Sequence, residues 1–512
     1  MNVSPTDADY FILPELEGLV TGATVQRYFT PPTPGTNNGA GYLGLVADTK
    51  FSVDRGFYST PFTVGITSAT ATASIYWTTN GSVPSLTNGT LYTGPVSIPG
   101  TRLLRAAAFL TNHVASEPDT HSYIFLNQVL QQSSNPPGYP TTWQGSFPAD
   151  YGMDPFIVNH PNYGVTLSND LRSIPTLSLV SDHDSFWNQT TGIYVDALEG
   201  SAASLYLGGE RATSAELFNG DNTSQFQINC AVQMHGQAGR DNARTPKHSF
   251  RLEFKGDYGP TRLDYDWYGG GVADFDSVIL RSTWADTWTT RYDPFSGGNY
   301  PWAIDFPLRY RPENATYLRD QWVKEAMRDM NHLASRGRHV HLYLNGLYWG
   351  IYNVIERLGP TYFANHLGGY EKDWDIIKDN SELQDGSRAD WDNLIALVNL
   401  GISSDADFQA VADQVDLDNL VDYFLLHALV EANDWLQISN PHNSYWAHRR
   451  ANATNGLAAT KWIFLPWDQE IAFNRLRNDD RVNGLSDGSL PSRLYNQLRN
   501  WPEFRRLYGD RV

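Results

Sequence analysis

Hydrophobic and polar positions follow different patterns in the two parts of the chain. In residues 51–126, short runs of β-branched and aromatic residues, such as "SIYWTT" and "RLLRAAAFL", recur at a spacing of about 8–12 residues between turn-forming segments. This spacing predicts a small all-β sandwich. From residue 176 onward, apolar residues first alternate with polar ones, as in "HSFRLEF", and later repeat with helical spacing, as in "LDNLVDYFLLHALVEAND". Strands that cluster before helices favour an α+β fold over a regular alternation of strands and helices.

Two further segments lack a regular hydrophobic period. Residues 1–50 end in "YFTPPTPGTNNGAGYLG", and residues 127–175 contain "QQSSNPPGYPTTWQG". Both stretches are rich in Pro, Gly and Asn, which is typical of linkers. We therefore predict the tail of an upstream domain and a linker at 1–50, a linker at 127–175, and one folded domain over 176–512. Because "WPEFRRLYGDRV" stops within a helical pattern that has no C-cap, we expect this domain to be truncated at its C-terminus.

Charge and composition exclude several classes of partner. The net charge of −19 and the pI near 5.0 disfavour binding to nucleic acid or to an anionic membrane surface. No window of about 18 residues is apolar throughout, so we predict no membrane span. The N-terminus lacks the basic and apolar segments of a secretion signal, and this alone leaves the compartment open. Cys230 is the only cysteine, which excludes an intramolecular disulfide, and its alternating apolar neighbours predict a core position.

Candidate chemistry lies near the end of the chain. An apolar helix runs into "EANDWLQISNPHN", a strand follows, and after a turn the apolar strand "KWIFLPWD" ends at Asp468. Asp434 and Asn443 therefore precede one arm of a predicted hairpin, and Asp468 follows the other. An Asp and an Asn from one loop with an Asp from the next is how protein kinases hold Mg²⁺ on the phosphates of a nucleotide. The alternative is that these residues only cap helices and turns, as Asp and Asn often do.

A lysine precedes this group along the chain. Lys247 in "NARTPKHSFRLEFKG" is one of only seven lysines and introduces a predicted strand. A lysine on an early strand, then an acidic helix, a hairpin, and the Asp/Asn–hairpin–Asp unit is the order found in protein kinases. Lys247 would then contact the α- and β-phosphates, with Asp320 or Glu325 of the helix "YLRDQWVKEAM" as its ion-pair partner. Glu356 falls where a hinge between two lobes would lie.

These segments resemble a known family. From about residue 176 to the C-terminus, the chain resembles the CotH family of atypical protein kinases, named for a spore-coat kinase, through "MHGQAGRDNARTPKHSFRLEFKG", "HVHLYLNGLYWGIYNVIER" and "FLPWDQE". Residues 51–126 resemble the Fn3-associated, chitobiase C-terminal-like β-sandwich module through "IYWTTNGSVPS" and "TLYTGPVSI". The resemblance implies a two-lobed atypical protein-kinase-like domain preceded by a small all-β sandwich.

The resemblance also implies roles for individual residues. It implies a catalytic acid at Asp434, a phosphate-binding lysine at Lys247, and metal ligands at Asp468 and Asn443. The other nucleotide-binding residues are then Gly236, Gly239 and Arg240 of "HGQAGR", together with Glu325 and Glu356. The cofactors would be ATP and Mg²⁺ or Mn²⁺.

Two features depart from the family pattern. Eight residues separate Asp434 from Asn443, where a typical kinase loop has four, so Asn440 is an alternative metal ligand. In addition, "GQAGR" lacks a serine that the family often carries before the lysine strand.

The function that follows is phosphotransfer from ATP to Ser or Thr of a protein partner, by a multidomain bacterial protein that is exported to the cell surface. The first alternative is a catalytically inactive kinase-like protein that acts as a surface or spore-coat-type structural module, with a β-sandwich that docks a glycan or a protein. A second alternative keeps the nucleotide but transfers AMP or an amino acid, because fold does not fix chemistry.

Overall fold

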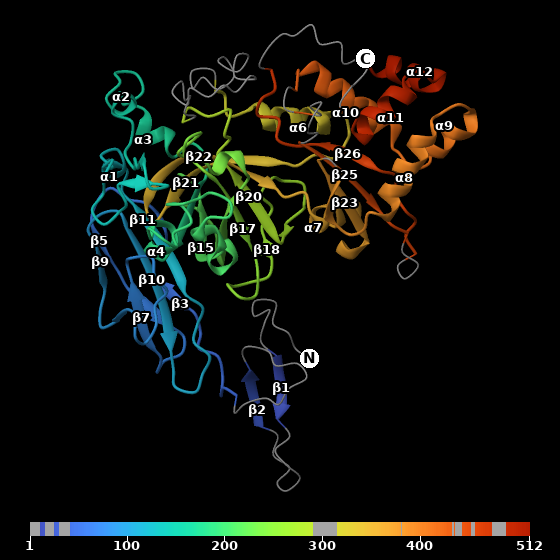
Figure 1. The fold of residues 1–512 in the computed structure, drawn as a ribbon. Helices are drawn as coiled ribbons and strands as arrows, with labels where there is room; N and C mark the ends of the chain where they lie inside the picture. Colours follow the sequence, from blue (N-terminus) through green and yellow to red (C-terminus); the bar gives the residue numbers. More distant parts are fainter. Residues whose placement is uncertain are drawn as a thin grey trace.

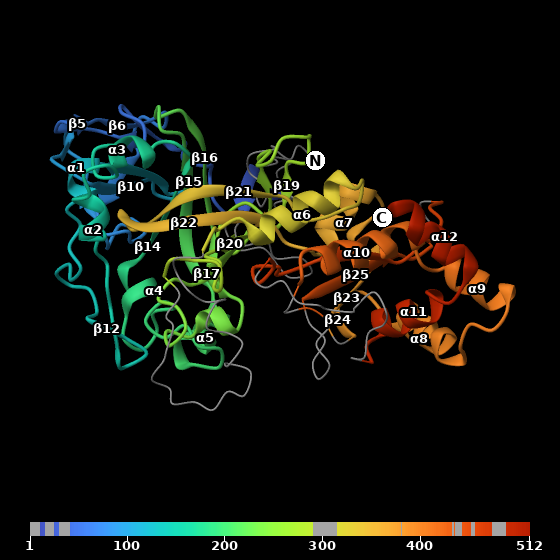
Figure 2. The same cartoon turned by 90° about the horizontal axis from the view of Figure 1, so that it is seen from above.

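The computed structural model describes residues 11–15, 25–29, 41–289, 315–379, 381–432, 435, 443–451, 456–473 and 488–512. Figures 1 and 2 show a β-rich module, a closed barrel beside it, and a helix-rich part that contains the C-terminus. The fold is therefore mixed, with strands early and most helices late. Among the described residues, no helix has the length and apolar character needed to cross a membrane.

The β-rich module consists of short strands in two layers. A five-stranded sheet has the order β4-β11-β10-β7-β8, and the pairs β3–β6 and β5–β9 contribute apolar side chains to the same core. Val64, Ile98 and Leu104 are fully buried between the layers. The strands are β3 (Thr49–Phe51), β4 (Gly56–Phe57), β5 (Phe62–Val64), β6 (Ile66–Ser68), β7 (Ser74–Thr78), β8 (Thr90–Leu91), β9 (Val96–Ile98), β10 (Arg102–Phe109) and β11 (Asp119–Ile124). Before the module, β1 (Phe11–Glu15) pairs with β2 (Val25–Phe29).

A closed seven-stranded barrel follows, in the order β14-β15-β16-β17-β20-β22-β21. Neighbouring strands are antiparallel except β14 and β21, whose parallel pairing closes the barrel. Cys230 and Val232 of β16 and Leu252 of β17 fill the interior, which confirms the predicted core position of Cys230. The strands are β14 (Thr176–Ser181), β15 (Arg211–Phe218), β16 (Ser224–His235), β17 (Ser249–Glu253), β20 (Ser277–Arg281), β21 (Gly337–Leu344) and β22 (Leu347–Glu356).

The segment 127–175 packs on the barrel and does not form a free linker. Trp143 and Tyr151 are buried in the barrel's core cluster against Trp187 and Trp349. Pro and Gly specify the irregular backbone of this segment, but its aromatic side chains still remove apolar surface from water. Its elements are α1 (Leu126–Val129), β12 (Thr142–Trp143), β13 (Phe147–Pro148), α2 (Pro155–Val158) and α3 (Leu167–Asp170).

Further short elements lie in the segments that connect the barrel strands between β14 and β20: α4 (His183–Trp187), α5 (Ala202–Leu205), η1 (Tyr206–Gly209), η2 (Ala238–Arg240), β18 (Leu263–Asp264) and β19 (Asp274–Phe275).

The helix-rich part surrounds a four-stranded antiparallel sheet with the order β24-β23-β25-β26. The predicted hairpin is present, because β25 pairs directly with β26. Trp391, Val421 and Phe464 lie in the core between the sheet and its helices. The elements are α6 (Arg319–Asp329), α7 (Pro360–Leu367), η4 (Glu371–Asp373), β23 (Trp374–Lys378), β24 (Glu382–Asp385), α8 (Ala389–Leu400), α9 (Asp405–Ala412), α10 (Leu417–Leu429), β25 (Ser444–Arg449), β26 (Ile463–Pro466), α11 (Leu490–Leu498) and α12 (Pro502–Arg511).

A buried carboxylate joins the β-rich module to the barrel. Glu216 of β15 is fully buried, and Arg55 Nε of the module lies 3.0 Å from its Oε1. The N–H of Ser122 donates to the same oxygen at 3.0 Å, and Arg55 Nη1 donates to the carbonyl oxygen of Phe226 at 3.1 Å. Because breaking a buried ion pair costs about 3–5 kcal/mol, these contacts hold the module and the barrel in one orientation.

Candidate functional site

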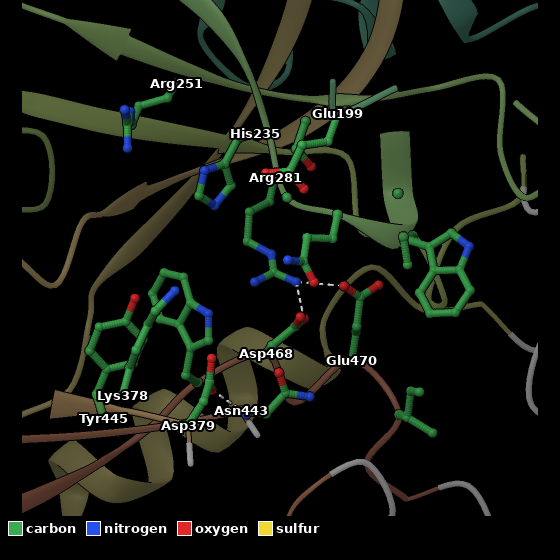
Figure 3. A pocket seen from close by; sticks show the side chains of 18 of the residues that line it. Glu199, His235, Arg251, Arg281, Lys378, Asp379, Asn443, Tyr445, Asp468 and Glu470 are labelled. Carbon is green, nitrogen blue, oxygen red and sulfur yellow. Dashed lines mark hydrogen bonds and ion pairs between the residues drawn. The ribbon is translucent and has the colours of Figure 1, made fainter. Parts of the chain in front are cut away.

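A cleft of about 800 Å³ lies between the barrel and the four-stranded sheet (Figure 3). The barrel contributes the end of β16, residues 236–239, and polar side chains of β17 and β20. The sheet contributes residues at the end of β23, the start of β25 and just after β26. The principal polar residues of the cleft are Glu199, His235, Ser249, Arg251, Arg281, Lys378, Asp379, Asn443, Asp468 and Glu470.

The antiparallel order of the sheet explains why three oxygen-bearing side chains meet at one edge. The end of β23 lies beside the start of β25. On the other side of β25, the end of β26 lies beside the same start. The N–H of Asp379 donates to the carbonyl oxygen of Ser444 at 3.0 Å, and the N–H of Asn443 donates to Asp379 Oδ1 at 2.9 Å. Asp468 follows β26 at the same edge. The expectation from the hairpin that Asn443 and Asp468 lie at one end of a small sheet is therefore met by their positions.

All three of these residues have a left-handed backbone conformation. The φ angles are 51° for Asp379, 59° for Asn443 and 53° for Asp468. Asp and Asn enter this region more easily than other non-glycine residues, yet it remains a sparsely populated conformation that clusters at functional sites. In Figure 3 the side chains of Asn443 and Asp468 lie close together at the floor of the cleft.

Arg281 of β20 is the centre of a buried ionic network. Its guanidinium group pairs with the carboxylates of Asp468 and Glu470, and its Nε lies 3.7 Å from Asp320 Oδ2 of α6. Asp320 is also bound by Lys324 Nζ at 2.6 Å, and its Oδ1 accepts the N–H of Gln469 at 2.8 Å. The network therefore ties the barrel, α6 and the segment after β26 together around the cleft.

The two carboxyl groups beside Arg281 have opposite pKa shifts. Burial by itself raises the pKa of Asp468, but the Arg281 guanidinium and a hydrogen bond from Glu470 lower that pKa to about 2. Burial and the adjacent charge of Asp468 raise the pKa of Glu470 well above its usual range. Asp468 is thus the ionised member of the pair, and 35% of its side chain is exposed because it opens into the cleft. An ionised and accessible carboxylate beside an amide oxygen suits a hard divalent cation.

The barrel side of the cleft supplies neutral and cationic groups. Burial, together with the charges of Arg251 and Arg281, lowers the pKa of His235 to about 3, so its ring is neutral at physiological pH. Gly236 has φ of +88°, and a Cβ added there would meet nothing within 4 Å. The loop after β16 therefore keeps a glycine for its backbone conformation and leaves open space beside it.

The structure does not bring Lys247 to the cleft. Its Nζ lies 3.8 Å from the ring centroid of Trp349, in a cation–π contact, and burial lowers its pKa to about 8. Among the described residues, the two expected ion-pair partners of Lys247 contact other side chains: Asp320 contacts Lys324 and Arg281, and Glu325 contacts Gln321 and Arg328. The phosphate-binding role of Lys247 stays a prediction. Strand β17 begins only at Ser249, after Pro246, so the alternation that points Ser249 and Arg251 into the cleft does not extend back to the lysine. Arg281 is instead the barrel-strand cation that pairs with an acid of α6, Asp320.

Three other expected nucleotide-binding residues also lie outside the cleft. Arg240 donates to the carbonyl oxygen of Ala197 and lines a separate cavity of about 210 Å³. Glu325 accepts hydrogen bonds from Gln321 and Arg328 on the exposed side of α6.

Glu356 is buried at the end of β22. It pairs with Arg336 Nη2 at 2.7 Å and with His366 Nε2 of α7 at 2.9 Å. The hinge between two lobes at Glu356 stays a prediction, and the Glu356 carboxylate binds protein groups and does not line the cleft.

Four expected residues do line the cleft: Gly236, Gly239, Asn443 and Asp468. Asp434 and Asn440 lie outside the described residues, so the catalytic acid and the alternative metal ligand stay predictions. Sequence reasoning missed Arg281, although it is the one charged residue of the apolar strand "SVILR" and such a residue is a signal for a buried ion pair.

Comparison with known families agrees with this geometry. The chitobiase/beta-hexosaminidase C-terminal domain matches residues 53–122, which lie in the β-rich module. The CotH kinase protein family matches residues 232–512, more than half of the chain, and this range contains every polar cleft residue named above except Glu199. No curated protein matches the chain. The chain therefore belongs to the CotH kinase protein family and carries a chitobiase/beta-hexosaminidase C-terminal domain before the region that matches this family.

Proposed function

We propose that the cleft binds ATP with a divalent cation and transfers a phosphoryl group to Ser or Thr of a protein partner. The observation that carries this proposal is the ionised and accessible Asp468, which lies beside Asn443 and opposite an arginine held by an acid of α6. Membership of a kinase family supports the reaction class. The Ser/Thr acceptor is the part of the proposal that rests on the family alone.

The order of elements around the cleft supports a two-lobed kinase-like arrangement. A glycine-containing loop connects β16 and β17, Arg281 lies on the adjacent β20, and Asp320 lies on the following α6. Protein kinases place a glycine-rich loop, a strand lysine and a helix glutamate in this order over the phosphates. In this proposal the barrel with α6 is the first lobe and the four-stranded sheet with its helices is the second.

The side chains of the cleft fit the proposed ligands. Asp468 and Asn443 would hold Mg²⁺ or Mn²⁺, because both present oxygen atoms and Asp468 is ionised. When bound, the cation supplies charge neutralisation for the phosphates. Arg281 has five N–H donors and a permanent charge, so it can retain Asp320 and still donate to a phosphate oxygen. A volume of about 800 Å³ lies within the range of small-molecule sites, about 300–1,000 Å³.

The test is intact-mass spectrometry after incubation with ATP and Mn²⁺. We expect a phosphate-sized gain, on the chain itself or on an added acceptor protein, for the wild type and none for Asp468→Ala. Asp385→Ala is the matched control, because Asp385 is exposed at the end of β24 on the same sheet but outside the cleft. An AMP-sized gain would keep the site and change the reaction. No gain, together with no ATP-induced rise in melting temperature, would refute the proposal.

A second proposed role concerns the β-rich module. Its match to a domain of carbohydrate-processing enzymes supports docking to a glycan or a cell-surface partner. Retention of the whole chain on an insoluble polysaccharide, measured with and without free oligosaccharide as competitor, tests this role independently of phosphotransfer.

A further inference from the structure

A second group of ligand-type side chains lies in the helix-rich part, away from the cleft. Asp375 of β23, Asp390 in the first turn of α8 and His448 of β25 each offer one ligand atom, and these atoms all lie within 4.8 Å of one another. Asp375 is fully buried and His448 is nearly so, whereas 47% of the Asp390 side chain is exposed. None of the three lines the cleft.

The distances within this group match a tetrahedral metal site. His448 Nε2 lies 3.3 Å from Asp375 Oδ2 and 3.3 Å from Asp390 Oδ2. The contact with Asp375 is within hydrogen-bonding distance, although charge-assisted N–H···O hydrogen bonds are usually shorter, about 2.7–2.9 Å. For bonds of about 2.0 Å to Zn²⁺, the edge of a tetrahedron is ~3.3 Å. Two of the three edges of the group therefore have the length that tetrahedral coordination requires.

The other ring nitrogen of His448 has a partner that is compatible with metal binding at Nε2. Nδ1 lies 3.4 Å from the carbonyl oxygen of Thr460, which can only accept a hydrogen bond. With the proton on Nδ1, the lone pair of Nε2 would face the two carboxylate oxygens and could bind a cation together with them. A metal-bound histidine usually donates its second N–H to such a carbonyl group.

The oxygens of Asp375 are held in a way that suits a metal ligand. Oδ1 accepts the N–H of Ser387 at 2.6 Å and lies 3.1 Å from Arg450 Nε, which leaves Oδ2 for the site. Gly386 permits this contact, because an added Cβ there would lie only 2.3 Å from Asp375 Oδ1. The surrounding backbone therefore fixes the direction of the carboxylate.

We propose that Asp375, Asp390 and His448 bind a Zn²⁺ ion, with water as the fourth ligand. Asp375 and His448 are cross-strand partners on β23 and β25, so the ion would join these strands and the start of α8. The same two strands lead to Asp379 and Asn443 at the cleft. The ion would thus fix the sheet at the end opposite the phosphotransfer site.

The test is zinc binding to the full chain after chelation and removal of the chelator. We expect one tightly bound Zn²⁺ per chain in the wild type, and a tetrahedral d–d absorption band when Co²⁺ replaces Zn²⁺. Asp468→Ala, which removes the proposed ligand of the cleft, should keep this ion, so failure of the proposed phosphotransfer would not affect the result.

Variants and controls make the test specific. His448→Gln should abolish the tight zinc and the Co²⁺ band, and Asp390→Asn should do the same with little risk to folding, because Asp390 is half exposed. Asp392→Asn is the matched control, since Asp392 lies in the same first turn of α8 but pairs with Arg388. Absence of zinc in the wild type, or equal zinc in the Asp390 and Asp392 variants, would overturn the proposal.

Discussion

Replacing Arg281 by Met tests whether the buried network organises the cleft. Only 7% of the Arg281 side chain is exposed, and it pairs with Asp468, Glu470 and Asp320. In the variant Asp320 keeps Lys324 as a cationic partner, whereas Asp468 and Glu470 lose their contact with the guanidinium group. Removing one partner of a buried ion pair costs about 3–5 kcal/mol, and we expect the free energy of unfolding at pH 7 to fall by that amount.

The pH dependence separates charge from packing. The folded pKa of Asp468 is about 2, below its usual 3.8, so its ionised form stabilises the wild type above about pH 4 and this contribution is lost as pH falls toward 2. In Arg281→Met the guanidinium no longer lowers the pKa of Asp468, whereas burial still raises it. The difference in stability between wild type and variant should therefore be largest near pH 7 and shrink as pH falls.

Urea unfolding followed by tryptophan fluorescence at several pH values measures this difference. Arg328→Met is the matched control, because Arg328 forms an exposed pair with Glu325 on α6 and should change stability by no more than about 0.5 kcal/mol. A loss for Arg281→Met below about 1 kcal/mol, or one that stays equal at all pH values, would refute the reasoning.

Two further predictions concern single residues. Lys247→Met should retain the ATP-induced rise in melting temperature measured by calorimetry, because Lys247 Nζ contacts Trp349 outside the cleft. Loss of that rise would indicate that Lys247 takes part in nucleotide binding. Cys230 should not react with a thiol reagent such as DTNB in the folded protein, because it is fully buried and burial raises the pKa of its thiol. We expect reaction only after urea unfolding, and rapid reaction in the native state would contradict the barrel core described above.

The large-scale pattern was predictable from the sequence because it depends on local periods. Alternation located strand β17, helical spacing located α6 and α10, and the turn between two strands located the β25–β26 hairpin. That hairpin also placed Asn443 and Asp468 at one edge of the sheet. The segment 127–175 was predicted to be a linker because its turn-forming residues indicate an irregular backbone. The burial of Trp143 and Tyr151 depends instead on strands that are distant in the sequence.

The ionic partners could not be read from local patterns. Arg281 and Asp468 are 187 residues apart and meet only once the barrel and the sheet are both formed. Alternation suggested that Lys247 introduces the strand, whereas the strand begins two residues after Lys247. The direction of the Glu356 side chain is set by Arg336 and His366, which come from other elements.

The Arg55–Glu216 contact has a consequence for which partners could reach the cleft. A recognition module on a flexible tether raises the local concentration of its partner over a broad shell whose radius depends on the length of the tether. Here the buried ion pair fixes the module against strand β15 of the barrel. A partner that binds the module would thus be presented to the cleft from one direction and at one distance. Acceptor sites would then be selected by their position on that partner as well as by their local sequence.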